Sequence, residues 1–207
     1  MHFEELRKKI KDWPIFKIED ILKWFPETKT KILANQLYLW TKKGYIQRIK
    51  RNLYKFSEFK INDHFILANF IYPPCYISLE TALNYYGIVP DIPQMITLIT
   101  PLTTRRFKTD FGNFFYHHIK KDYFFGWRTI KAKEKNCFYN VALPEKALLD
   151  FIYFNSKRLS ELFDFKEERF EFDKNFDWAK FLKMSKIFKN KKVQNIALKI
   201  KKFYAAS

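Results

Sequence analysis

Cysteine and glycine are both scarce in this sequence of 207 residues, and each shortage excludes a class of protein. The two cysteines, Cys75 and Cys137, are too few and too far apart for a disulfide scaffold, which predicts reduced thiols in a cytosolic protein. The four glycines are scattered along the chain and do not cluster. A glycine-rich loop that cradles phosphate, of the GxxxxGK or GxGxxG kind, is therefore absent.

Long hydrophobic runs are also missing. Runs such as Phe65–Phe70 and Met95–Ile99 are far shorter than the ~20 apolar residues that a membrane-spanning helix needs. The first residues, Met1–Arg7, lack the charged region followed by an apolar region that marks a secretory signal. We therefore expect a cytoplasmic protein that does not insert into a membrane.

Basic residues, in contrast, are abundant. The formal net charge is +17, which is the footprint of a protein that binds a polyanion. A second explanation is codon bias, because lysines outnumber arginines by 31 to 8 and AT-rich codons encode lysine. The charge is uneven: residues 1–58 carry +7, residues 59–154 carry +3 and residues 155–207 carry +7. With 47% apolar residues the chain can bury a core, and its length suits one large or two small domains.

The first 58 residues predict three short helices and a hairpin. Apolar residues at helical spacing indicate a helix from Phe3 to Trp13, and a second over Ile18–Phe25. A third helix is expected from about Glu27 to Lys43, with Thr28 as N-cap, Gly44 at the position after the C-cap, and Leu33, Leu37 and Trp40 facing inward. Tyr45–Phe56 predicts two strands around a turn at Arg51–Asn52, because Asn tolerates the left-handed backbone of such turns.

Three short helices followed by a basic hairpin is the order of a winged helix-turn-helix. The outward face of the third helix can enter a major groove, where Asn35 suits adenine and the lysines suit guanine or phosphate. The hairpin can clamp the flanking backbone. The predicted DNA-binding residues are Thr28, Lys29, Lys31, Asn35, Tyr38, Lys42, Arg48, Lys50 and Arg51. The alternative is a solvated basic face on a small helical module that binds protein.

Five stretches carry a resemblance to a known family: Leu39–Tyr54, Tyr76–Ile88, Ile96–Thr100, Gly112–Ile119 and Ala142–Asp150. In these stretches, over about residues 15–155, the chain resembles the AbiEi-type antitoxins of type IV toxin–antitoxin (abortive infection) systems. The resemblance implies a transcriptional autoregulator that binds operator DNA and also counters a toxin similar to nucleotidyltransferases. One position departs from the family pattern, because Asn52 stands where the family often has Gly after the arginine of the hairpin.

The remaining residues, 59–207, predict an α+β domain. A helix is expected over residues 62–71, a second from Ser78 as N-cap to about Tyr86, and a third from Pro144 through Tyr153. Residues rich in β-branched and aromatic side chains predict a small, mostly antiparallel sheet. Its strands are Met95–Thr100, Phe111–Ile119, Trp127–Lys133 and Cys137–Val141.

Chemistry-bearing residues are few in this domain. Glu145 and Asp150 are five residues apart on one helix and do not share a face, and Asp150 suits an ion pair with Lys146 at i+4. His117 and His118 are neighbours in a strand and point to opposite faces, so the pair cannot form one metal site. We predict no enzyme, no catalytic residue, no metal and no cofactor.

The tail predicts basic amphipathic helices over about residues 177–204. From Lys180 to Ser207 there are nine lysines and no acidic residue. Such helices can lie on membranes, bind acidic partners or line a nucleic-acid surface. We expect the apolar stripes, Trp178 to Phe188 and Val193 to Tyr204, to pack on the α+β domain.

Two functions remain in view. The first is a sequence-specific DNA-binding autoregulator with antitoxin activity, with a winged helix-turn-helix at residues 1–58 and an antitoxin domain at residues 59–207. The second is a non-enzymatic interaction module that neutralises a partner by contact and binds nucleic acid weakly and without specificity. The outward face of the third helix separates the two, since an interaction surface should expose apolar groups there.

Overall fold

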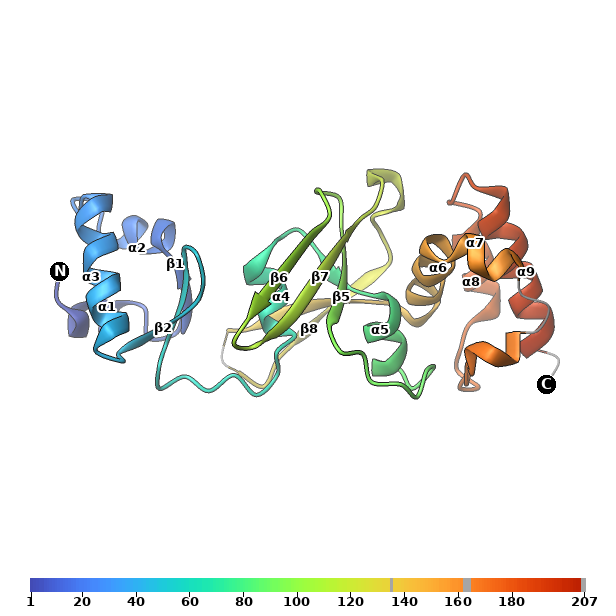
Figure 1. Ribbon diagram of the computed structural model, residues 1–207, viewed down its shortest axis with the longest axis horizontal. Helices are drawn as coiled ribbons and strands as arrows, with labels where there is room; N and C mark the ends of the chain where they lie inside the picture. The colour runs from blue at the N-terminus through green and yellow to red at the C-terminus, as the bar shows by residue number, and fades with distance from the viewer. Residues whose placement is uncertain (135, 162–164, 206–207) are drawn as a thin grey trace.

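The computed structural model describes residues 1–134, 136–161 and 165–205 (Figure 1). It is an α+β protein with a small sheet near the N-terminus, a larger sheet in the middle and helices at the C-terminal end. The N-terminal part contains α1 (Phe3–Lys9), β1 (Ile15–Lys17), α2 (Ile18–Trp24), α3 (Thr30–Lys42), β2 (Ile46–Lys50) and β3 (Leu53–Phe56).

The small sheet has the order β1-β3-β2, and both of its pairings are antiparallel. Strands β2 and β3 form the predicted hairpin, whereas β1 is an addition to the prediction. Phe16 of β1 lies opposite Tyr54 of β3. One face of this sheet and the three helices enclose a core made of Leu6, Ile10, Phe16, Ile21, Leu33, Leu37, Trp40, Ile46 and Phe56.

Helix α3 confirms the predicted inward stripe and the predicted end, because Leu33, Leu37 and Trp40 are buried and Gly44 has a φ of +73°. The predicted start is wrong. The N-cap is Lys29, and Thr28 lies in a turn in which its N–H donates to the Phe25 carbonyl at 3.0 Å. Helix α1 is also shorter than predicted: it ends at Lys9, and the Trp13 side chain is exposed.

The larger sheet has six strands in the order β6-β7-β5-β4-β9-β8. It is mixed, because β5 pairs parallel with β7 and β4 pairs parallel with β9, while the other three pairs are antiparallel. The four predicted strands are present within two residues at each end, but the predicted small, mostly antiparallel sheet is wrong in size and pairing, because β4 and β6 were not predicted and two of the five pairings are parallel. The strands are β4 (Tyr76–Ile77), β5 (Ile96–Thr100), β6 (Arg105–Thr109), β7 (Gly112–His118), β8 (Trp127–Lys131) and β9 (Phe138–Ala142).

Helices cover both faces of this sheet. The Tyr116 hydroxyl donates to the Ala68 carbonyl of α4 (Ile66–Ile71) at 2.9 Å. Thr97 of β5 lies opposite Phe115, the residue next to Tyr116 on β7, and therefore points to the other face. Its hydroxyl forms a hydrogen bond with the hydroxyl of Thr81 in α5 (Leu79–Tyr85). Since successive residues of a strand point to opposite faces, α4 and α5 lie on opposite sides.

Helix α4 begins at Ile66, four residues later than predicted. The residues just before α4 are not helical. The Glu134 carboxylate accepts the N–H groups of Asn62 (3.0 Å) and Asp63 (3.3 Å).

The C-terminal helices pack on α6 (Pro144–Phe154), as predicted for the tail. The inward side chains of the last helix, from Val193 to Ile200, are buried in the same core as the larger sheet. The other elements are the short helix η1 (Lys121–Tyr123), α7 (Ser156–Glu161), η2 (Phe165–Glu168), α8 (Trp178–Ser185) and α9 (Lys191–Tyr204). Among the described helices, none combines the length and the apolar character needed to cross a membrane.

The N-terminal part and the larger sheet are in contact. Ile15, Ile49 and Leu53, on the second face of the small sheet, belong to the core of the larger sheet. Two lysines reinforce the contact: the Lys50 ammonium lies 5.1 Å from the Phe107 ring centre, and the Lys55 ammonium 5.6 Å from that of Phe111. The hairpin is therefore anchored to the second domain.

Candidate nucleic-acid interface

The outward face of α3 is polar and exposed. Lys31, Asn35, Tyr38 and Lys42 recur at helical spacing on the side away from the core, and all four are exposed. The Lys42 ammonium lies 5.7 Å from the Tyr38 ring centre, which holds the two side chains next to each other. These four side chains are brought together as the sequence predicts.

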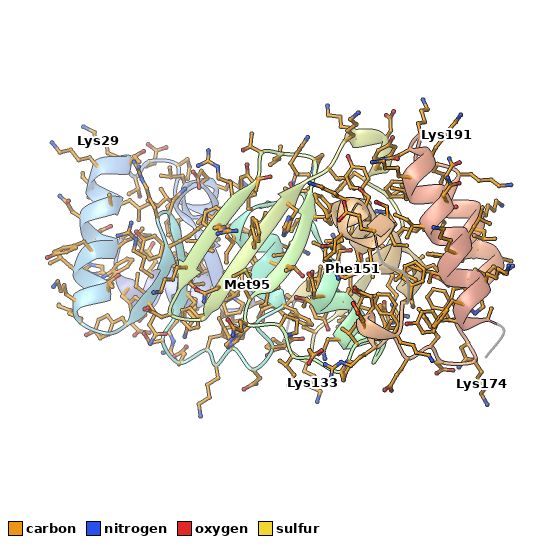
Figure 2. All side chains as sticks on the ribbon, turned by 45° about the vertical axis from the view of Figure 1, so that its right-hand side comes forward. Lys29, Met95, Lys133, Phe151, Lys174 and Lys191 are labelled. Carbon is orange, nitrogen blue, oxygen red and sulfur yellow. The ribbon has the colours of Figure 1, made fainter. Side chains whose placement is uncertain are left out.

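Thr28 and Lys29 lie at the N-terminal end of α3 and not on its face. Thr28 is half-buried in the turn after α2, and the Lys29 carbonyl accepts the N–H of Leu33 at 3.0 Å. The side chain of Lys29 is exposed at the end of the helix, where Figure 2 labels it. A contact of these two residues with DNA would therefore be made at the helix end.

The turn of the hairpin is held by Asn52. Its φ of +65° lies in the left-handed region, which Asn adopts more readily than most residues with a side chain. Its side-chain oxygen accepts the N–H of Ile18 at 3.1 Å, and its Nδ2 donates to the Glu19 carboxylate at 2.6 and 2.8 Å. Glycine could adopt this turn but could not form these bonds. Asn52 thus ties the hairpin to the start of α2.

Arg48 and Arg51 are exposed on the hairpin. The Arg48 Nε donates to the Lys50 carbonyl at 3.3 Å, within the hairpin itself. Lys50 lies differently: it is half-buried and its ammonium lies over the Phe107 ring. Loss of hydration, and secondly the charge of Lys17, lower the pKa of Lys50 below its ordinary value. Of the three basic residues predicted on the hairpin, two face solvent and one faces the second domain.

A groove of about 660 Å³ separates α3 from the hairpin. It includes Tyr38, Arg48 and Arg51, which the sequence predicts, and further residues that the sequence prediction missed. On the helix side, the groove is lined by a stripe of α3 next to the predicted face. The stripe has the helical spacing i, i+4, i+8, i+11 and consists of Thr30, Ala34, Tyr38 and Thr41, so the sequence could have indicated it. The missed residues are Ile18, Glu19, Thr30, Ala34, Thr41, Asn52 and Tyr54.

The second domain contains a buried polar cluster on α6. Lys146 and Asp150 form the predicted ion pair at i+4, and both side chains have no exposed surface. The Asp150 carboxylate also accepts the hydroxyls of Tyr76 (3.0 Å) and Ser78 (2.8 Å). Ser78 is the N-cap of α5, as predicted, but its side chain is used here instead of in the cap. All four side chains are fully buried, so the cluster joins α6 to β4 and the start of α5 inside the core.

Other candidate groups are also separated. His117 is half-buried against Phe115, with 3.8 Å between ring centres, whereas His118 is exposed and its Nδ1 lies 2.8 Å from the Leu102 carbonyl oxygen. Glu145 forms an ion pair with Lys180 at 3.1 Å. Within the described part of the chain, no three His, Cys, Asp or Glu side chains are placed to hold a metal ion.

Comparison with protein-family models and with curated proteins finds no match for this chain.

Proposed function

We propose that this chain is a DNA-binding transcriptional autoregulator whose α3 and β2–β3 hairpin bind double-stranded operator DNA. The observation that carries the proposal is an exposed polar face on α3 beside two exposed arginines of the hairpin. The element order helix, strand, helix, helix, strand, strand, with β3 between β1 and β2, is the order of a winged helix-turn-helix and supports it. The protein would act in the cytoplasm.

Each group has a role that follows from its chemistry. Asn35 can form a bidentate contact with adenine, and Lys31 and Lys42 can contact guanine or phosphate. Arg48 and Arg51 would contact phosphates on the far side of the groove, which positions α3 without reading sequence.

The hairpin's role is tested by the salt dependence of DNA binding. Affinity for DNA falls with salt because each phosphate contact releases a counterion. Arg51→Ala should therefore make the negative slope of log K against log[salt] less steep by about 1. Arg48→Ala should behave in the same way. Lys50→Ala is the matched control, since its ammonium lies over Phe107, and its slope should stay near that of the unmodified chain. An unchanged slope in Arg48→Ala and Arg51→Ala would remove the hairpin from the interface.

We further propose antitoxin activity in the second domain, directed at a nucleotidyltransferase-like toxin. Support comes from the resemblance in Tyr76–Ile88 and Ala142–Asp150, two stretches that meet where Ser78 bonds to Asp150. No catalytic step is assigned to the chain. Co-expression with a neighbouring nucleotidyltransferase gene tests the proposal. Residues 59–207 should restore growth, and failure of the full chain to restore it would contradict antitoxin activity.

A second candidate function is favoured by apolar exposure on α3. Ile32 and Leu39 are 52% and 54% exposed, as an interaction module would require. Leu39→Ser separates the two functions. If α3 binds a protein partner, this change weakens partner binding and leaves DNA binding intact, whereas a DNA-reading helix is more sensitive to loss of Asn35.

A further inference from the structure

A second concave site lies in the second domain, and none of its lining residues belongs to α3. The pocket has a volume of about 570 Å³, within the range of roughly 300–1,000 Å³ that is typical of ligand sites. Its residues come from α5 and the loop that follows it, from β5, β7, α6 and α7, and from η2 and the residues after it, in the middle and right of Figure 1. Phe115 and His117 of β7, Phe151 of α6 and Phe170 provide ring surfaces in its lining. Figure 2 labels two of the lining residues, Met95 and Phe151.

The pocket reverses the sign of the protein's charge. The whole chain carries +17, yet four carboxylates and two guanidiniums line this pocket, which gives a local charge of −2. A positive ligand would therefore be attracted here and repelled by most of the remaining surface. The charged residues are Glu80, Asp91, Glu167, Glu168, Arg158 and Arg169.

One wall already binds a guanidinium of the chain itself. Arg158 forms a two-pronged ion pair with Glu168, and its guanidinium carbon lies 5.9 Å from the Phe151 ring centre. The hydrogen bond to Glu168 raises the pKa of Arg158 most, and the negative charges of Glu80 and Glu167 add to the rise. In the described part of the chain, Glu80 and Glu167 form no ion pair of their own. The pocket thus combines aromatic rings with carboxylates in excess of its cations.

The two sides of the pocket are fixed to each other. Arg169, after η2, forms an ion pair with Asp91 in the loop between α5 and β5. The N–H of Glu171 donates to the Ile88 carbonyl at 2.9 Å, which joins the same two segments. The two segments are therefore joined without a ligand's contribution, which lowers the entropic cost of ordering them on binding.

Apolar side chains are exposed at the pocket. Ile92 is 85% exposed and Met95 is 36% exposed. A small free amine would leave Ile92 in water, whereas a peptide with apolar residues beside its cation would cover it. Apolar side chains surrounded by charged groups are the usual composition of a protein-binding site.

We propose that this pocket binds an arginine or lysine side chain of a protein partner, presented by a segment whose neighbouring residues are apolar. The cation would lie among Glu80, Glu167 and the aromatic rings, where cation–π attraction adds to the ion pairs. Its apolar neighbours would pack on Ile92 and Met95. The site is independent of DNA binding by α3, so either proposal can fail without the other.

Calorimetric titration of the full chain with blocked tripeptides tests the proposal. A Leu-Arg-Leu peptide should bind saturably, and Leu-Gln-Leu should bind at least tenfold more weakly because it lacks the charge. The double variant Glu80→Gln/Glu167→Gln should lose at least tenfold in affinity for Leu-Arg-Leu. The matched control Glu27→Gln/Asp110→Asn changes the net charge equally at two exposed positions outside the pocket, and it should bind like the unmodified chain.

A second variant keeps the test decisive if the double variant unfolds. Ile92→Ser changes a side chain that is almost fully exposed, so the fold should persist while affinity for the peptide falls. Absence of saturable binding, equal affinity for the two peptides, or unchanged affinity in the pocket variants would overturn the proposal. Spermidine binding as tightly as Leu-Arg-Leu would also overturn it, because the apolar neighbours would then contribute nothing.

Discussion

Lys146 illustrates how much one residue can depend on its neighbours. Its ammonium has no exposed surface, donates to Asp150 and to the Tyr76 hydroxyl (2.8 Å), and lies near the rings of Phe125 and Phe188. Burial lowers the pKa of Lys146 and raises that of Asp150, and the attraction between the two charges opposes both shifts. Removal of one partner would leave the other charge buried alone.

Lys146→Met should therefore destabilise the fold by roughly 3–5 kcal/mol at pH 7, measured by urea unfolding. The double variant Lys146→Met/Asp150→Asn should recover much of this loss, because no uncompensated charge remains.

The single variant should also regain stability as the pH falls. Burial raises the pKa of Asp150 in the folded state above its value in the unfolded chain. Between these two pKa values the folded state binds the proton more tightly, so the free energy of unfolding rises as the pH falls. A single variant as stable as the unmodified chain would show that the ion pair contributes nothing.

At the scale of elements, most helices and strands were predictable, whereas the strands β1, β4 and β6 and the helix α7 were not. The spacing of Leu33, Leu37 and Trp40 predicts α3, and Gly44 predicts its end. Strands β1 and β4, with three and two residues, are too short for an alternating pattern and exist through pairing with distant strands. The orientation of Lys50 likewise depends on Phe107, which no local pattern contains.

Two leucines of α3 provide a prediction at this scale. Leu37 is fully buried, so Leu37→Ala should destabilise the protein by roughly 2–5 kcal/mol through a core cavity. Leu39→Ala on the same helix is the control, because its side chain is 54% exposed and should change stability by less than about 0.5 kcal/mol. Thermal and urea unfolding measure both. Equal losses would mean that the helix is rotated from the orientation described.

At the scale of the molecule, the N-terminal part is not independent of the second domain. The sequence predicts a boundary near residue 58, where the pattern of the first segment ends, and such a change of pattern says nothing of packing. In the structure Ile15, Ile49 and Leu53 join the core of the second domain. Hydrophobic residues on both faces of a short sheet could not be assigned to two cores from the sequence.

Residues 1–58 expressed alone should therefore be less stable than the same residues in the full chain. In the fragment the second face of the small sheet is exposed to water. Each large aliphatic side chain there then loses about 1.5–3 kcal/mol of stabilisation from burial. Circular dichroism should show a lower melting temperature for the fragment. A titration with DNA should show binding that is still specific but weaker than that of the full chain. A fragment that melts at the temperature of the full chain would show that the contact between the two parts adds no stability.

Sequence-specific reading of DNA by α3 is the central claim, and Asn35→Ala tests it most directly. Duplexes selected from a random-sequence pool by the full chain provide the target, with scrambled duplexes and a melting curve as controls. We expect the unmodified chain to prefer the selected duplex by about 10³-fold or more. Asn35→Ala should lose roughly 1–3 kcal/mol of that preference, with unchanged affinity for scrambled DNA and an unchanged melting temperature. An unmodified chain with no preference, or a variant that loses affinity equally for both duplexes, would contradict the claim.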